Sequence, residues 1–337
     1  MRAMLFKAAG QPLAVEDLPD PEPGEREVVI RVARCGVCGT DLHVTSGHGM
    51  TLPADSQLGH EFGGEVVALG KGVERLKLGD PVAALPVVGC GRCEGCRTGL
   101  DMLCANQWSG YGSGLAQYAR VSERGATILP RTLGLEDSAL VEPLAVGCRA
   151  VRLADPARDA RVVIIGPGPI GLSVLFWLRQ RGVENIVLLA SSGRRRALAG
   201  AMGGDRFVVE SDGAKDEIYQ ILGGAPDIVF EAAGVSGVLQ RAVDLVKPQG
   251  LVMGLGFCMQ PDPIVPAMNL MKDVTMRWSI IYTRADFQAC ADALDRDGAL
   301  ARAMVTETVG IDAAPAAFEV LREGRGGGGK LLIDPWN

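Results

Sequence analysis

Histidine and aromatic residues are scarce in this chain of 337 residues. There are 3 histidines, and aromatic side chains make up 5% of the residues, so no platform for stacking sugars stands out. The longest apolar run ends too soon to span a bilayer, and the first residues turn polar too early for a secretory signal. Excess positive charge is also missing: the net charge of −6 argues against nucleic acid and anionic membranes as partners. We therefore expect a cytoplasmic protein that acts on small molecules.

The length and residue pattern predict an α/β protein of two domains. The chain is longer than one hydrophobic core usually serves, and its 47% apolar and 22% charged residues are ordinary for a globular protein. Short strands and turns dominate up to about residue 136, as in 27–33 and 61–69. Strands and helices then alternate, as in 161–165, 171–181 and 185–189. Such alternation predicts a parallel sheet with helices on both faces.

Four of the 9 cysteines stand at C-x2-C-x2-C-x7-C within one short lobe. Four closely spaced thiolates suit tetrahedral zinc. A disulfide cluster is disfavoured because nothing indicates secretion, whereas an iron–sulfur cluster is an alternative that thiolates also suit. Since all four positions are filled, the predicted zinc site is structural. Its ligands are Cys90, Cys93, Cys96 and Cys104.

A second group of possible metal ligands precedes the lobe. Cys35 and Cys38 are followed by His43 and by the pair His60-Glu61, and all three histidines lie between positions 43 and 60. A catalytic zinc takes about three protein ligands and keeps one position for water or substrate. The alternative is a cysteine pair with surface histidines in a loop.

A glycine-rich turn follows the expected strand at 161–165 and opens an apolar helix. In this context G-x-G-x-x-G is typical of a Rossmann dinucleotide site, in which the helix N-terminus faces the pyrophosphate. The alternative is a similar turn in a domain that binds no dinucleotide. The expected cofactor-binding residues of the turn are Gly166, Gly168, Pro169, Ile170 and Gly171.

The end of the next strand predicts NADP in preference to NAD. NAD-binding domains carry an acidic residue there, whereas this chain reads Ala-Ser-Ser-Gly-Arg-Arg-Arg over 190–196. Hydroxyl groups and guanidinium groups favour a 2′-phosphate through charge-assisted hydrogen bonds. We expect contacts from Ser191 and Arg195, with Arg194 and Arg196 as substitutes. The alternative is that the arginines only begin a solvated helix and NAD binds.

The motifs together give a family resemblance. GVCGTDLH, GHEFGGEVVALGKGVERLKLGD and the four-cysteine lobe resemble the zinc-containing medium-chain alcohol dehydrogenases, above all the polyol, butanediol and threonine dehydrogenase branch. The resemblance implies a GroES-like catalytic domain at 1–143 and 283–337, with the structural zinc lobe at about 89–105. It also implies a Rossmann domain at 144–282, an active site in the cleft between the domains, and a homodimer or homotetramer.

The resemblance also implies roles at the catalytic zinc. Cys38 and His60 are ligands, Cys35 is a neighbour, and either Glu61 or Glu142 of the EPLAV motif completes the sphere. Thr40 and His43 are expected to pass the substrate's proton to solvent, and Asp41 to orient a ligand or hold the loop. On the cofactor side, the resemblance implies contacts from Ala232, Leu255 and Lys330.

The expected reaction is hydride transfer between a secondary alcohol or vicinal diol, or the corresponding carbonyl compound, and NADP. Two zinc ions per chain are expected, one catalytic and one structural. The alternatives are a non-catalytic relative that binds zinc and nucleotide, and a polyol or sugar dehydrogenase that uses NAD. The substrate pocket is expected around 48–57, 108–111 and 278–282, but the sequence does not identify the substrate.

Overall fold

The chain divides into two compact units, as seen in a computed structural model that describes residues 1–47, 52–106 and 109–337. Unit 1 comprises Met1–Glu142 and Thr283–Asn337, and unit 2 comprises Pro143–Tyr282. The boundary expected from the sequence, between 143 and 144, differs from this division by one residue. Within the described ranges, no helix has the length and apolar character needed to cross a membrane.

Unit 1 is built around a seven-stranded sheet in which strand β3 (Glu27–Gly36) is central. The sheet runs β10-β6-β5-β3-β18-β17, and β9 pairs with the first half of β3. Valine and isoleucine of β3 alternate into a buried cluster with Phe62 and Phe318. The other strands of this sheet are β5 (Glu61–Leu69), β6 (Pro81–Ala84), β9 (Tyr118–Ser122), β10 (Ala126–Ile128), β17 (Val305–Gly310) and β18 (Lys330–Asp334).

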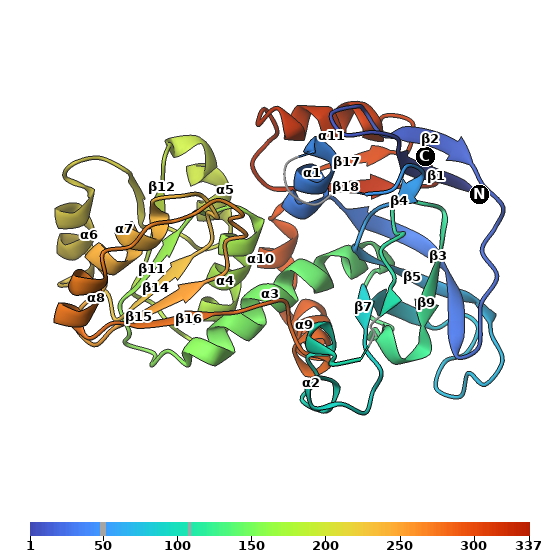
Figure 1. Ribbon diagram of the computed structural model, residues 1–337, viewed down its shortest axis with the longest axis horizontal. Coiled ribbons are helices and arrows are strands. Elements are labelled where there is room, and N and C mark those ends of the chain that lie inside the picture. The colour runs from blue at the N-terminus through green and yellow to red at the C-terminus, as the bar shows by residue number, and fades with distance from the viewer. Residues whose placement is uncertain (48–51, 107–108) are drawn as a thin grey trace. The chain divides into compact units, whose positions relative to one another are not determined.

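Smaller elements complete unit 1 (Figure 1). A three-stranded sheet has the order β2-β1-β4, and a two-stranded sheet of β7 and β8 adjoins the cysteine lobe. Their bounds are β1 (Arg2–Phe6), β2 (Ala14–Asp17), β4 (Ser56–Gln57), β7 (Val87–Val88) and β8 (Ser109–Gly110). The helices are α1 (Gly39–Ser46), α2 (Glu94–Arg97), α9 (Arg284–Asp297), α10 (Ala299–Arg302) and α11 (Ala314–Arg322), with a 3-10 turn at Asp101–Leu103.

Unit 2 is a six-stranded sheet in the order β13-β12-β11-β14-β15-β16, and every neighbouring pair is parallel (Figure 1). Its central strands β11 (Val162–Ile165), β12 (Ile186–Ala190) and β14 (Ile228–Glu231) are apolar and buried, as expected of a sheet covered on both faces. The outer strands are β13 (Phe207–Val209), β15 (Leu251–Gly254) and β16 (Thr275–Trp278). The helices are α4 (Pro169–Gln180), α5 (Arg196–Ala201), α6 (Ala214–Leu222), α7 (Val238–Leu245) and α8 (Pro266–Lys272), and α3 (Ser138–Ala154) spans the boundary.

The parallel sheet and the β-rich unit confirm the predicted α/β fold class. Helix α1 was not predicted, because its segment reads as a loop of glycine, polar residues and possible ligands. The helix expected at 194–202 begins as a 3-10 turn over Gly193–Arg195 before α5 starts.

Candidate active site

Unit 1 brings three predicted zinc ligands together. One possible ligand atom from each of Cys38, His60 and Glu61 lies within 4.8 Å of the other two. The sheet register explains this convergence: Gly36 at the end of β3 pairs with Glu61 at the start of β5, so the residues that follow and precede these positions meet at one edge. A thiolate, an imidazole and a carboxylate are suitable ligands for zinc.

Helix α1 positions the first of these ligands. Cys38 is the N-cap, and its backbone N–H donates to Oδ2 of Asp41 over 2.9 Å. Asp41 is 2% exposed, and its other oxygen lies 3.4 Å from Nδ1 of His60. With Nδ1 facing this carboxylate, Nε2 is the nitrogen left for a metal. A single buried carboxylate therefore contacts two candidate ligands.

The surroundings of His60 change its protonation. Burial lowers the pKa of His60, but the charge of Asp41 and hydrogen bonds to Asp41 and Cys38 outweigh this effect, and the net pKa is well above 6.5. Without a metal, the imidazole is therefore held as a cation between acidic partners. Metal binding must displace that proton, because only the neutral ring coordinates.

Glu61 has the most distinctive environment in the group. The side chain is fully buried, and its Oε1 accepts a hydrogen bond of 2.6 Å from Nζ of Lys330. Its Oε2 has no hydrogen-bond partner among the described residues. A buried carboxylate oxygen without a donor is costly unless something else satisfies it. The donor set and this unpaired oxygen fit a zinc ion held by Cys38, His60 and Glu61.

The placement of Lys330 differs from the expectation of a cofactor contact. Lys330 begins β18, is 2% exposed, and donates to the carbonyl of Val37 over 3.2 Å as well as to Glu61. An ammonium that is buried and already has two acceptors is not available to a cofactor phosphate. The structure therefore corrects this prediction and places Lys330 behind the candidate metal ligands.

The other residues predicted for the catalytic zinc site lie outside the group of Cys38, His60 and Glu61. Glu142 on α3 is 6% exposed and does not belong to the three-ligand group found among the described residues. Its charge nevertheless acts on Lys330. The hydroxyl oxygen of Thr40 lies 3.7 Å from Sγ of Cys38, and His43 is exposed on α1. Cys35 is buried and outside the group, as expected of a neighbour.

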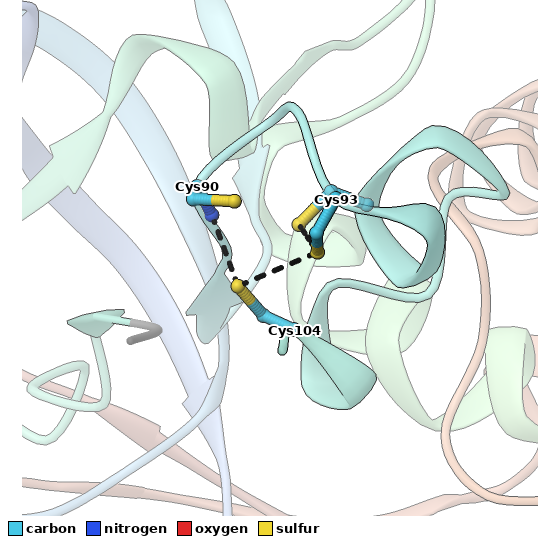
Figure 2. A group of neighbouring side chains, drawn as sticks. Cys90, Cys93 and Cys104 are labelled. Atoms are coloured by element: carbon cyan, nitrogen blue, oxygen red, sulfur yellow. Dashed lines mark hydrogen bonds between the residues drawn. The ribbon is translucent and has the colours of Figure 1, made fainter. Parts of the chain in front are cut away.

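The four-cysteine lobe is a second candidate metal centre, and Figure 2 shows the sulfur atoms of Cys90, Cys93 and Cys104 turned toward one another. Possible ligand atoms of Cys90, Cys93, Cys96 and Cys104 lie within 4.8 Å of one another. The Sγ of Cys93 lies 3.5 Å from that of Cys96 and 3.8 Å from that of Cys104. Sulfurs bound tetrahedrally to one zinc are about 3.8 Å apart, far more than the roughly 2.05 Å of a disulfide. The lobe therefore fits a metal and not a disulfide.

Hydrogen bonds prepare part of the lobe for metal binding. The backbone N–H of Arg92 and the amide of Asn106 lower the pKa of Cys90 to about 5. Burial instead raises the pKa of Cys96 to about 11. One thiolate is therefore present at neutral pH before metal arrives, and another forms only when the metal displaces its proton.

Two arginines connect the lobe to the rest of unit 1. Asp101 within the lobe is 4% exposed and accepts from Arg124 over 3.0 Å and from Arg284 over 2.9 Å. Arg124 also donates to the carbonyl of Gly89, and Arg284 to that of Cys96. These contacts fix the base of the lobe independently of its sulfur atoms.

The glycine turn of unit 2 has the geometry of a phosphate-binding loop. It joins β11 to α4, with Gly166 at φ +87° and Gly168 as the N-cap of the helix. A Cβ on Gly166 would lie 2.7 Å from the backbone nitrogen of Ala233, so no other residue fits there. Pro169 and Ile170 start the helix, and Gly171 packs closely on the turn. A helix N-terminus that follows such a turn is a typical binding position for an anion.

The residues predicted to bind a 2′-phosphate lie at the same edge of the sheet. β11 and β12 are parallel neighbours, so Ser191 after β12 is on the side of the glycine turn. A guanidinium nitrogen of Arg195 is 3.8 Å from where a Cβ of Gly168 would lie. Arg196, a predicted substitute, instead donates to the carbonyl of Phe207 and stacks on its ring, which removes it from this role. Arg195 is left as the better placed of the two.

Ala232 and Leu255 lie at the ends of β14 and β15. The turn after β14 is also stabilised by a residue that sequence reasoning missed. Buried Glu231 accepts from the backbone N–H groups of Ala233 and Gly234 over 2.7 and 2.8 Å. The only sequence signal for this role of Glu231 was an acidic residue at the end of an apolar strand.

Of the segments predicted to line the substrate pocket, 48–51 and 108 lie outside the described residues.

Comparisons with known proteins agree with both units. The family model named alcohol dehydrogenase GroES-like domain matches residues 24–131. The family model named zinc-binding dehydrogenase matches residues 169–296. An L-threonine 3-dehydrogenase of Saccharopolyspora erythraea is 30% identical over 99% of both chains. An (R,R)-butanediol dehydrogenase of Bacillus subtilis is 30% identical over 89% of this chain and 90% of its own.

Solved structures are similar over nearly the full chain. An alcohol dehydrogenase from Escherichia coli CFT073 complexed with NADH has a TM-score of 0.89 and 25% identity, covering 99% of both chains. A putative zinc-binding dehydrogenase from Sinorhizobium meliloti bound to NADP has a TM-score of 0.87 and 28% identity, also covering 99% of both. With the ligand group of unit 1 and the glycine turn of unit 2, these likenesses show that the chain belongs to the zinc-containing medium-chain alcohol dehydrogenase family and is an oxidoreductase acting on CH–OH groups.

Proposed function

We propose that this protein is a zinc-dependent alcohol dehydrogenase, or carbonyl reductase, that transfers a hydride between a secondary alcohol or vicinal diol and NADP. The observation that carries this proposal is the convergence of Cys38, His60 and Glu61, with Oε2 of Glu61 buried and unpaired among the described residues. The four-cysteine lobe would hold a second, structural zinc.

Each residue at the catalytic group has a distinct task in this proposal. Zinc held by these residues would act as a Lewis acid and would lower the pKa of a substrate alcohol. The hydroxyl of Thr40, 3.7 Å from Sγ of Cys38, is close enough to the ligands to accept the proton of that alcohol. The exposed His43 on the same helix would release it to solvent. Asp41 holds His60 in the orientation that leaves Nε2 for the metal.

Glu61 is our choice for the third protein ligand. It belongs to the three-ligand group, whereas Glu142 does not. Glu142 is buried near enough to Lys330 for its charge to act there, so it contributes negative charge to the same region. Replacing each glutamate by glutamine and measuring zinc content separates the two. We expect the loss of zinc to be greater for Glu61→Gln than for Glu142→Gln.

The preference for NADP rests on the end of β12. Ser191 follows that strand where NAD enzymes carry an acid, and the Arg195 guanidinium adjoins Gly168. Relatives with NADH and with NADP are both known, so the cofactor needs its own test. Arg195→Ala should raise KM for NADP roughly tenfold to a hundredfold and change that for NAD little, because a hydrogen bond to a charged group contributes about 1.5–3 kcal/mol. Arg206→Ala, elsewhere on unit 2, is the control. A wild-type protein that prefers NAD would contradict the assignment.

The substrate class follows from the relatives and from Glu142. The relatives named above are dehydrogenases of threonine and of a butanediol, and the EPLAV segment around Glu142 resembles that branch. The decisive experiment is a steady-state assay with secondary alcohols, vicinal diols and the corresponding ketones, with NADP and NAD, before and after chelation. Turnover that chelation abolishes supports the proposal. Bound cofactor without turnover on any of these substrates would favour a non-catalytic relative.

We also propose a homo-oligomer, as a homodimer or homotetramer. Strand β16 is at the edge of the sheet of unit 2, and large apolar side chains are exposed on it and on nearby α8. They include Leu270 and Met271, which are 81% and 85% exposed, and Trp278 at 60%. An exposed edge strand beside apolar side chains favours pairing with another chain. Sedimentation analysis of the wild type and of Trp278→Lys tests this surface.

A further inference from the structure

Lys330 is buried at a place where a lysine is costly. Its side chain is 2% exposed, and an ammonium moved from water into a protein interior must be compensated by partners. It has two acceptors, Oε1 of Glu61 at 2.6 Å and the carbonyl of Val37 at 3.2 Å. These two contacts hold the end of the side chain against Glu61 and the segment that precedes Cys38.

The sheet places this ammonium next to the candidate metal ligands. β18 is antiparallel to β3, with Leu332 opposite Gly36, and the backbone N–H of Val37 donates to the carbonyl of Leu331. Lys330 therefore lies beside the segment that leads from β3 to Cys38. Glu61 enters from the other side of β3, where it pairs with Gly36. The two side chains meet across the end of one central strand.

The hydrogen bond from Lys330 gives the two carboxylate oxygens of Glu61 different surroundings. Oε1 is bound to Lys330, whereas Oε2 is buried without a hydrogen-bond partner among the described residues. Gly36 leaves the space that Oε2 occupies, because a Cβ there would collide with it. The carboxylate therefore offers one oxygen to the ligand group, and turning it to offer both would break its bond to Lys330.

We propose that Lys330 is a positioning residue that retains Oε1 of Glu61, so that the carboxylate binds the catalytic metal through Oε2 alone. This inference rests on the proposed function, in which Cys38, His60 and Glu61 hold that metal. Lys330 competes with the metal for the carboxylate. It thereby weakens the hold of Glu61 and keeps a coordination position open for substrate.

The test uses cobalt(II) in place of zinc in the full-length protein. Four-coordinate cobalt absorbs visible light more strongly than five-coordinate cobalt, so its spectrum reports how many atoms bind. The lobe also takes up cobalt, and its signal is removed by subtracting the spectrum of Cys38→Ser. In Lys330→Met, Glu61 is free to bind through both oxygens. We expect the absorption of the Cys38 site to fall about twofold or more, and metal loss to a chelator to slow at least tenfold.

Three further variants make the result specific. Lys330→Arg keeps the charge and should restore the wild-type spectrum. Lys272→Met removes a lysine of unit 2 that binds three backbone carbonyls, and it should leave the spectrum of the Cys38 site unchanged. Glu61→Gln must alter the spectrum if Glu61 is a ligand at all.

Each contrary outcome has its own meaning. If Lys330→Met leaves the spectrum unchanged while Glu61→Gln alters it, the positioning role is wrong and the proposed metal site stands. Faster metal loss with a lower unfolding temperature in Lys330→Met would show a merely structural role and would also overturn the inference. If Glu61→Gln has no effect on the spectrum, Glu61 is not a ligand, and both the inference and that part of the proposed function fail.

Discussion

The two candidate metal centres of unit 1 are assembled in opposite ways. The four cysteines of the lobe lie within fifteen residues, and backbone N–H groups of the same loop lower the pKa of Cys90 and of Cys93. The other centre takes Cys38 from the N-cap of α1, His60 from the position before β5 and Glu61 from the start of β5, and Lys330 of β18 binds Glu61. A local site can be read from spacing, whereas a site shared among strands exists only when the sheet is in register.

The two centres also differ in what surrounds the ligands. The lobe offers four thiolates, which would fill a tetrahedral site, and two arginines bind its buried Asp101. The second centre has three candidate ligands, with a hydroxyl and a histidine on the adjoining helix. A closed set of ligands stabilises a fold, and an open one leaves room for a substrate. The comparison therefore predicts that damage to the lobe affects stability first and damage to the other centre affects turnover first.

The largest expected effect is at the centre formed by Cys38, His60 and Glu61, which is called the open centre below. Cys38→Ser removes a ligand there and should lower kcat/KM by about a thousandfold or more, because metal catalysis supplies several kcal/mol of transition-state stabilisation. The unfolding temperature should change little, since Cys38 is at a helix end and not in the core. Activity assays and thermal unfolding measure the two effects. Cys258→Ser, in unit 2, is the matched control.

At the lobe, Cys96→Ser should lower the free energy of unfolding by about 4 kcal/mol, because loss of a structural metal is among the most destabilising single changes. Metal content should fall from two ions per chain to one, with the Cys38 site still loaded. Denaturant unfolding and metal analysis check this result. A variant that stayed fully folded and lost only turnover would reverse the assignment of the two centres.

The next prediction concerns the carboxylate that orients the open centre. Asp41→Asn keeps the size of the side chain but removes the charge that faces His60 and accepts from Cys38. Zinc affinity at this site should fall by roughly 10- to 100-fold, as for other groups that orient metal ligands. Competition with a chelator measures it. Asp262→Asn, which alters a carboxylate bound to backbone N–H groups in unit 2, should leave zinc affinity unchanged.

The smallest effect is expected at the base of the lobe. Asp101→Asn leaves Arg124 and Arg284 without their shared carboxylate and should lower the free energy of unfolding by about 1–2 kcal/mol. Both arginines are about one-third exposed, so solvent screening reduces the loss below that of a fully buried pair. Asp312→Asn breaks an exposed ion pair with Arg2 and should change stability much less. Equal losses in the two variants would contradict the anchoring role of Asp101.

Sequence reasoning succeeded where a signal is local. The strand at 61–69 was predicted with its observed bounds, and the glycine turn does lie between β11 and α4. Lys330 was misplaced because its partner is 269 positions away, and no pattern near residue 330 reports that distance. Glu231 was overlooked as a support for the turn after β14 because an acidic residue at a strand end has many possible roles.

The sequence by itself determined the family, the α/β architecture, the closed lobe and the residues from which the open centre is built, because spacing and residue type carry that information. Only the tertiary structure showed that Glu61 lies together with Cys38 and His60, and that Lys330 binds this carboxylate. The physical reason is the pairing of β5 and β18 with the same end of β3. That pairing places a charge from each neighbouring strand beside the ligands, and a linear sequence does not record it.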